Sequence, residues 1–131
     1  MIKAYLTLIG IAYAGLAIWC AAKPLQTAES VGFRLSPGSG QSEYLTVYGG
    51  LQFGMAIIFL GCWWRADLAM PALFACIAIH GCLVVFRAIS FALFRDIGTT
   101  TYVLAGLEWL IFLGGIGVLL FARKPDVTPA P

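Results

Sequence analysis

The chain has 131 residues, of which 61% are hydrophobic and 11% are charged, and its formal net charge at pH 7 is +2. Soluble domains carry about a quarter of charged residues, and a water-soluble domain of this size has too much surface to hide so many apolar side chains. The composition therefore predicts an integral membrane protein. The basic residues are dispersed rather than gathered in a stripe with aromatic residues, which excludes nucleic acid as a partner.

Four apolar stretches have about the length needed to cross a ~30 Å hydrocarbon layer. A helix satisfies its own backbone hydrogen bonds, which lipid cannot do, so each stretch is predicted to be a transmembrane helix. Short connections make neighbouring helices antiparallel. We therefore expect an all-α membrane protein, a single domain in which four transmembrane helices form an antiparallel bundle. The predicted helices cover about residues 4–22, 44–64, 68–94 and 101–122, and a polar, proline-rich tail covers residues 123–131.

The longest connection, Lys23–Ser42, separates the first two predicted helices. Pro24 suits the first position of a helix and Gly32 suits its end, so this connection could contain a short helix that lies in the membrane interface. An irregular loop is the alternative. In an interfacial helix, the side chains facing lipid would be Leu25, Ala28 and Phe33, and those facing water would be Gln26, Glu29 and Arg34.

Basic residues outside the helices indicate an orientation. The side that holds both termini would carry one more basic residue than the other side, and the cytoplasmic side usually carries the excess. We therefore expect both termini in the cytoplasm. The larger set is Lys3, Arg65, Arg123 and Lys124, and the smaller set is Lys23, Arg34 and Arg95.

The cysteines and the single histidine indicate neither a redox site nor a metal site. Cys20, Cys62, Cys76 and Cys82 lie in or at the ends of apolar stretches without a CxxC pair, so they are interpreted as small buried hydrophobic residues. His80 is alone, which rules out bis-histidine haem within one chain, and no Cys/His cluster has zinc spacing. We therefore expect no metal and no cofactor.

Two charged residues lie deep inside the predicted helices. A charged side chain at this depth costs a few kcal/mol, so it usually has a partner or a function. Arg87 comes ten residues before the turn at Ile97–Gly98, and Glu108 comes ten residues after it. The two side chains should lie at one depth and pair. Structural pairing is the favoured interpretation, and a direct role in binding a ligand or ion is the alternative.

Other polar residues could extend this site. Gln52 and Tyr48 lie one turn apart on the second predicted helix at a similar depth, and Glu43 lies at the mouth. His80 is two turns from Arg87 on the same stripe and could continue a polar track inward, although a packing histidine with satisfied hydrogen bonds is favoured. The constellation could be a binding site, a proton path or a structural clasp.

Small residues indicate where helices pack closely. Gly50 and Gly54 form a GxxxG pattern in the second helix, where Gly49 is a third expected packing glycine, and Gly10 with Ala14 forms a similar pair in the first. Such spacing lets helix backbones approach each other in lipid. We expect packing within the protein, with a dimer face as the alternative.

The order of these residues resembles a bacterial four-helix membrane family called domain of unknown function 4345. The resemblance covers nearly the whole chain, but Leu45 stands where the family pattern has an arginine, so a role that depends on that arginine would not carry over. The resemblance implies a four-helix topology and a bacterial inner membrane. It implies no activity, since the family's function is not established. The matching residues are Glu43, Tyr48, Gly49, Gly50, Gly54, Arg87, Ser90 and Glu108.

The sequence favours a non-enzymatic accessory or assembly subunit that packs with other membrane proteins or with itself, because it has little soluble mass and several small-residue faces. The alternative is a binder or carrier of a lipid-like or quinone-like molecule, held between the helices with Arg87, Gln52 and Tyr48 at its polar end. An enzyme is the least favoured hypothesis, because no Ser/His/Asp set, P-loop or paired-carboxylate site is present.

Overall fold

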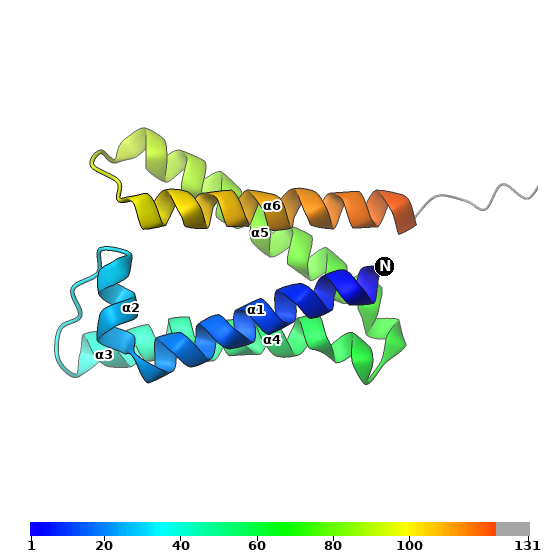
Figure 1. Cartoon of the computed structure of the whole chain (residues 1–131), viewed down its shortest axis with the longest axis horizontal. Coiled ribbons are helices and arrows are strands. Elements are labelled where there is room, and N and C mark those ends of the chain that lie inside the picture. Colours follow the sequence, from blue (N-terminus) through cyan, green and yellow to red (C-terminus); the bar gives the residue numbers. More distant parts are fainter. Residues whose placement is uncertain (123–131) are drawn as a thin grey trace, which may run out of the picture.

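The computed structural model describes residues 1–122, and its elements are helices (Figure 1). Four segments are long and apolar enough to cross a membrane. The prediction of an all-α protein with four such helices is therefore confirmed, while the tail predicted at 123–131 lies outside the described residues. The four segments are Ile2–Ala22, Ser39–Trp63, Ala66–Leu93 and Thr99–Ala122.

Only two of the four spanning segments are single α-helices. These are α1 (Ile2–Ala22) and α6 (Thr99–Ala122). A short helix, α2 (Pro24–Ser30), follows α1. The second segment combines α3 (Ser39–Tyr44), the π-helical turns of η1 (Leu45–Leu51), α4 (Gln52–Leu60) and the 3₁₀ turn η2 (Gly61–Trp63). The third combines the 3₁₀ turn η3 (Ala66–Leu68) with α5 (Ala69–Leu93).

The connection between α1 and α3 contains the short helix that Pro24 and Gly32 predict. Gly32 has a φ of +83°, a conformation that glycine adopts without strain, and the chain leaves the helix there. Ala28 was expected to face lipid, but it is buried against Cys20 and Tyr44. The prediction for Ala28 was wrong because this side of α2 packs on the end of α1 and on Tyr44, whereas Leu25 and Phe33 are exposed as predicted.

The second spanning segment begins at Ser39, earlier than the predicted Tyr44. Gly38 precedes it with a φ of +75° and donates its backbone N–H to Oε1 of Gln41 at 3.2 Å. This bond satisfies a donor that would otherwise lack a partner at the helix start. The polar residues of this first turn are therefore helical, although their composition resembles a loop.

The first and second spanning segments form an antiparallel pair (Figure 1). At one end Nε1 of Trp63 donates to Oγ1 of Thr7 at 2.6 Å. At the other end the hydroxyl of Tyr44 donates to Sγ of Cys20 at 3.7 Å. The early part of one helix therefore contacts the late part of the other at both ends.

α5 and α6 form the second antiparallel pair. A Cβ placed on Gly81 would lie 3.0 Å from Cε2 of Phe112, and one on Gly115 would lie 2.8 Å from Cγ1 of Ile77. Glycine therefore permits the close contact along this pair.

The two pairs meet at the end that holds the start of α1. One buried cluster joins α1 to the second spanning segment and to the first turns of α5, and the hydroxyl of Tyr5 in α1 donates to the carbonyl of Ile111 in α6. Toward the other end the two pairs diverge, and α2 rises from the end of α1 beside them (Figure 1). The cluster consists of Leu6, Ile9, Phe59, Cys62, Ala72, Leu73 and Cys76.

The expected close packing at Gly50 and Gly54 is absent. A Cβ on either glycine would meet no heavy atom within 4 Å, whereas a Cβ on Gly10 would lie 2.7 Å from Cγ of Leu60. The GxxxG pattern marks a smooth face of the second segment, but α1 packs beside that face rather than on it. Only Gly49, the third of the expected packing glycines, is buried, and its Cβ would lie 3.7 Å from Ala21.

The cysteines also depart in part from the prediction. Cys20, Cys62 and Cys76 are buried, but Cys82 is exposed. Cys82 lies six residues after Cys76 on α5, and this spacing turns it away from the core. The interpretation as buried hydrophobic residues therefore holds for three cysteines and was wrong for Cys82.

Candidate functional site: a polar cavity beside the Arg87–Glu108 pair

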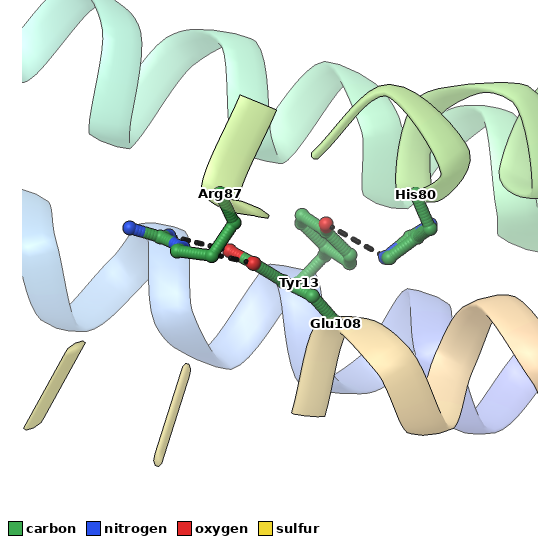
Figure 2. Close-up of polar contacts among 4 residues, drawn as sticks. All are labelled: Tyr13, His80, Arg87 and Glu108. Carbon is green, nitrogen blue, oxygen red and sulfur yellow. Dashed lines mark hydrogen bonds and ion pairs between the residues drawn. The ribbon is translucent and has the colours of Figure 1, made fainter. Parts of the chain in front are cut away.

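Arg87 of α5 and Glu108 of α6 form the ion pair that the turn count predicts (Figure 2). Nε of Arg87 donates to Oε2 of Glu108 at 3.0 Å, and Nη2 donates to Oε1 at 2.6 Å. Two parallel bonds of this kind are stronger and more directional than a single one. The side chains are 27% and 14% exposed, so both charges are largely removed from solvent.

The pair leaves part of the guanidinium unused. Its hydrogen bonds to Glu108 use Nε and one N–H of Nη2, whereas Nη1 donates to no residue in the described part of the chain. A guanidinium has five N–H donors in a fixed plane. Glu108 therefore holds Arg87 in place while further donors of Arg87 stay available.

His80 forms a separate contact instead of continuing the track toward Arg87. Its Nδ1 lies 2.8 Å from the carbonyl oxygen of Cys76, which can only accept, so Nδ1 carries the proton. Nε2 then accepts from the hydroxyl of Tyr13 at 3.0 Å (Figure 2). His80 is fully buried with both ring nitrogens bonded, as expected of a packing histidine.

Tyr13 was not identified from the sequence as a partner of His80. Buried tyrosine hydroxyls usually need a hydrogen-bond partner, so its position inside an apolar helix was a usable signal. The sequence does not show, however, which face of α1 points toward α5. That depends on how the two helix pairs pack.

A cavity of about 680 Å³ lies where the two helix pairs diverge. Its wall comes from α2 and the residues after it, from η1, from the end of α5 and from the start of α6. This volume is within the range of ligand sites. The polar side chains of the wall include Tyr48, Arg87, Ser90 and Thr101, and the apolar ones include Phe94 and Leu104.

Three hydroxyl groups in this wall are unused. Those of Tyr48, Ser90 and Thr101 make no hydrogen bond to any residue between 1 and 122. With Nη1 of Arg87 they form a set of donors around one volume. Such donors would bind the oxygen atoms of a carbonyl or phosphate group.

Aromatic contacts hold Tyr48 in position. Its ring stacks on Tyr44 at a centroid distance of 4.5 Å, and Phe33 approaches it edge-on at 5.8 Å. Both tyrosines belong to the second spanning segment, whose π-helical turns in η1 include Tyr48. π-helical turns occur often at functional sites. Apart from the Gly49–Gly50 pair, no residue pattern indicates these turns.

Four of the expected site residues do not line the cavity: His80, Glu43, Gln52 and Glu108, the last of which pairs with Arg87. Glu43 is exposed and is not part of the wall. Gln52 is also absent from the wall, and its buried Oε1 has no hydrogen-bond partner among the described residues. The sequence therefore identified Tyr48, Arg87 and Ser90 of the wall, but it did not identify Thr101, Glu29 or Asp96 as site residues.

Carboxylates dominate the charges around the cavity. Glu29 of α2 and Asp96 of the α5–α6 connection line it, and Arg87 is its one basic residue within the described chain. Neither carboxylate forms an ion pair with a described residue. No three His, Cys, Asp or Glu side chains within residues 1–122 are placed to hold a metal ion.

A second, shallower groove of about 320 Å³ runs between α1 and the second spanning segment. Its surface is almost entirely apolar. The residues that line it are Ala17, Ile18, Ala21, Leu45, Gly49, Gly50 and Phe53.

The chain matches no protein-family model, no curated protein and no solved structure. The site is therefore interpreted from its own geometry.

Proposed function

We propose that the protein binds a lipid-like or quinone-like amphipathic molecule in the cavity between its two helix pairs. The polar end of this ligand would accept hydrogen bonds from Arg87, Tyr48 and Ser90, while Phe94 and Leu104 would contact its apolar part. Ligand sites of helical proteins commonly combine apolar walls with a few polar groups that fix orientation.

One observation carries the proposal: the wall holds four donor groups, on Tyr48, Arg87, Ser90 and Thr101, without partners in the described chain. A purely structural ion pair would account for Arg87 and Glu108. It would not account for three further unbonded hydroxyls around a volume of about 680 Å³. These donors are partly exposed, so water can satisfy them when no ligand is bound, and a ligand that displaces this water would have to replace its hydrogen bonds.

The wider setting is part of the proposal. We propose that the four helices form an antiparallel bundle in a bacterial inner membrane and that the chain belongs to the family called domain of unknown function 4345. Three of the residues that carry that resemblance, Tyr48, Arg87 and Ser90, line one cavity although they lie far apart in the sequence. That convergence supports a shared site.

The proposed orientation places both termini in the cytoplasm. A membrane-impermeant thiol reagent would test it on single cysteines introduced into a cysteine-free variant. The reagent should label Ser39→Cys in intact cells and should leave Ala66→Cys unlabelled until the cells are opened. The reverse pattern would overturn the orientation without affecting the four helices.

Filling the cavity tests the binding function. Thr101 lines the cavity and its neighbour Thr100 does not. We expect native mass spectrometry of the protein in mild detergent to show one bound amphiphile per chain. Thr101→Leu should lower that occupancy several-fold, whereas Thr100→Leu should leave it unchanged. Equal occupancy in the two variants would contradict binding in this cavity.

Removing single hydroxyls tests the polar contacts. Tyr48→Phe deletes one donor from the wall while keeping the ring that stacks on Tyr44, and it should weaken ligand binding by about five- to tenfold. Tyr102→Phe is the matched control, because Tyr102 is exposed outside the wall. An identical affinity in both variants would exclude the Tyr48 hydroxyl from the site.

A second candidate function is that of an accessory subunit, which the open face of the second spanning segment favours. Gly50 and Gly54 meet no heavy atom within 4 Å, so another transmembrane helix could approach there. Gly50→Leu should then abolish a partner protein's co-purification without changing stability. A partner that is retained by Gly50→Leu, or no partner at all, would reject this candidate.

A further inference from the structure

The cavity has an unbalanced charge. Arg87 contributes one positive charge, which Glu108 already offsets from behind the wall. Glu29 and Asp96, which are both exposed residues, add two carboxylates to the cavity wall. The site and its immediate surroundings therefore contain three carboxylates and one guanidinium.

This charge pattern discriminates between classes of amphiphile. A ligand with a net negative headgroup would meet Arg87, but it would also be repelled by Glu29, Asp96 and Glu108. A neutral quinone could use the donors of the wall, yet it would leave both cavity carboxylates without a partner. A zwitterionic headgroup offers an anion to the donors and a cation to the carboxylates.

Resting on the proposed function, we propose that the ligand is a zwitterionic phospholipid of the ethanolamine class. Its phosphate would accept from Nη1 of Arg87 and from the hydroxyls of Tyr48 and Ser90, and its ammonium group would contact Glu29 and Asp96. A soluble phosphodiester can carry the same headgroup. We assign the ligand to the lipids because Phe94, Ile97 and Leu104 give the cavity apolar walls.

The order of residues along α5 fits this arrangement. Arg87 and Ser90 are three residues apart on one face of α5, and Phe94, the residue that follows α5, and Asp96 continue the cavity wall. The seven residues from Arg87 to Phe94 rise about 10 Å along the helix. Asp96 is therefore displaced from Arg87 toward the α5–α6 connection, so the basic group and this acidic group of the wall lie at different levels.

The carboxylates can be neutralised without disturbing the fold. Glu29 is exposed on α2, and Glu29→Gln keeps its size. Asp96 has a φ of +57°, a conformation that asparagine tolerates as well as aspartate does, so Asp96→Asn adds no backbone strain. Glu43→Gln is a matched control, because Glu43 is an exposed carboxylate outside the cavity.

The test compares lipids that share acyl chains and differ only in the headgroup. Delipidated protein in mild detergent is titrated with phosphatidylethanolamine or with phosphatidylglycerol, and native mass spectrometry gives the occupancy of the first site. We expect phosphatidylethanolamine to bind about tenfold more tightly, since two ion pairs replace repulsion. The Glu29→Gln/Asp96→Asn double variant should lose most of this preference, and Glu43→Gln should keep it.

The outcomes separate this inference from the proposed function. Both lipids could bind stoichiometrically in a way that depends on Tyr48. In that case, equal affinities for the two lipids, or an unchanged preference in the double variant, would overturn the headgroup assignment alone. Absence of a saturable site for either lipid would overturn the proposed function as well. Full displacement by soluble glycerophosphoethanolamine at equal concentration would show that the apolar walls contribute nothing, and it would contradict a lipid ligand.

Discussion

Breaking the Arg87–Glu108 pair should destabilise the protein far more than an ion pair of equal length at the surface. The perturbation is a double-mutant cycle of Arg87→Gln, Glu108→Gln and both together. Either single change leaves one charge without its partner between α5 and α6. The double variant leaves two amides that can still bond each other, so it should recover much of the lost stability.

The magnitude follows from burial. Removing one partner of a buried pair typically costs ~3–5 kcal/mol. Here the side chains retain 27% and 14% exposure, which lets water reach the remaining charge from the cavity. We therefore expect each single change to cost about 2–4 kcal/mol and the coupling energy to be about 2 kcal/mol.

The chain supplies a matched control for this cycle. Nη2 of Arg65 lies 2.6 Å from Oδ2 of Asp67, the same separation as between Nη2 of Arg87 and Oε1 of Glu108. The side chains of this second pair, however, are 69% and 62% exposed. Exposed pairs contribute about 0–1 kcal/mol, so the corresponding cycle at Arg65 and Asp67 isolates the effect of burial.

The assay is reversible unfolding of the purified protein in mixed detergent micelles, followed by circular dichroism. A coupling energy for Arg87 and Glu108 that is below about 0.5 kcal/mol, or equal to that of the exposed pair, would refute the reasoning. The pair would then not be desolvated in solution as the structure indicates.

Three further predictions concern the packing. Tyr13→Phe removes the donor to the buried Nε2 of His80 and should cost about 1–3 kcal/mol in the same unfolding assay, so an unchanged stability would show that this bond does not form. Gly10→Ala should lower the free energy of unfolding by about 1–3 kcal/mol through overpacking. Gly15→Ala should be neutral or slightly stabilising, because a Cβ there would have nothing within 4 Å. The opposite order of stabilities would contradict the α1–α4 contact. A small, uncharged maleimide should react first with Cys82 in the folded protein, and faster reaction of a buried cysteine would contradict the core.

The ion pair was predictable because charges are rare in apolar helices and a short turn fixes their relative depth. Counting residues from the turn placed Arg87 and Glu108 opposite each other, and their hydrogen bonds confirm this. Three residues of the cavity wall were likewise recognised, because polar side chains in such helices stand out. The sequence therefore indicates at which level along its helix each polar residue lies.

Rotation and separation of helices are not encoded so directly. The partner of His80 depends on which face of α1 points toward α5, and the cavity depends on how far the two pairs diverge. The prediction of close packing at Gly50 and Gly54 was wrong for the same reason. These glycines define a smooth face, but contacts elsewhere, including that of Gly10 with Leu60, decide which helix packs against it.

A ligand held by the Arg87 guanidinium can be observed directly by nuclear magnetic resonance. Deuterated protein with protonated arginine N–H groups would be studied in deuterated detergent with the co-purifying amphiphile. We expect nuclear Overhauser contacts from the side-chain N–H groups of Arg87 to non-exchangeable protons of the ligand, and none from exposed Arg65. Contacts of Arg87 with water alone, while the amphiphile is present in excess, would contradict the proposal that this cavity binds it.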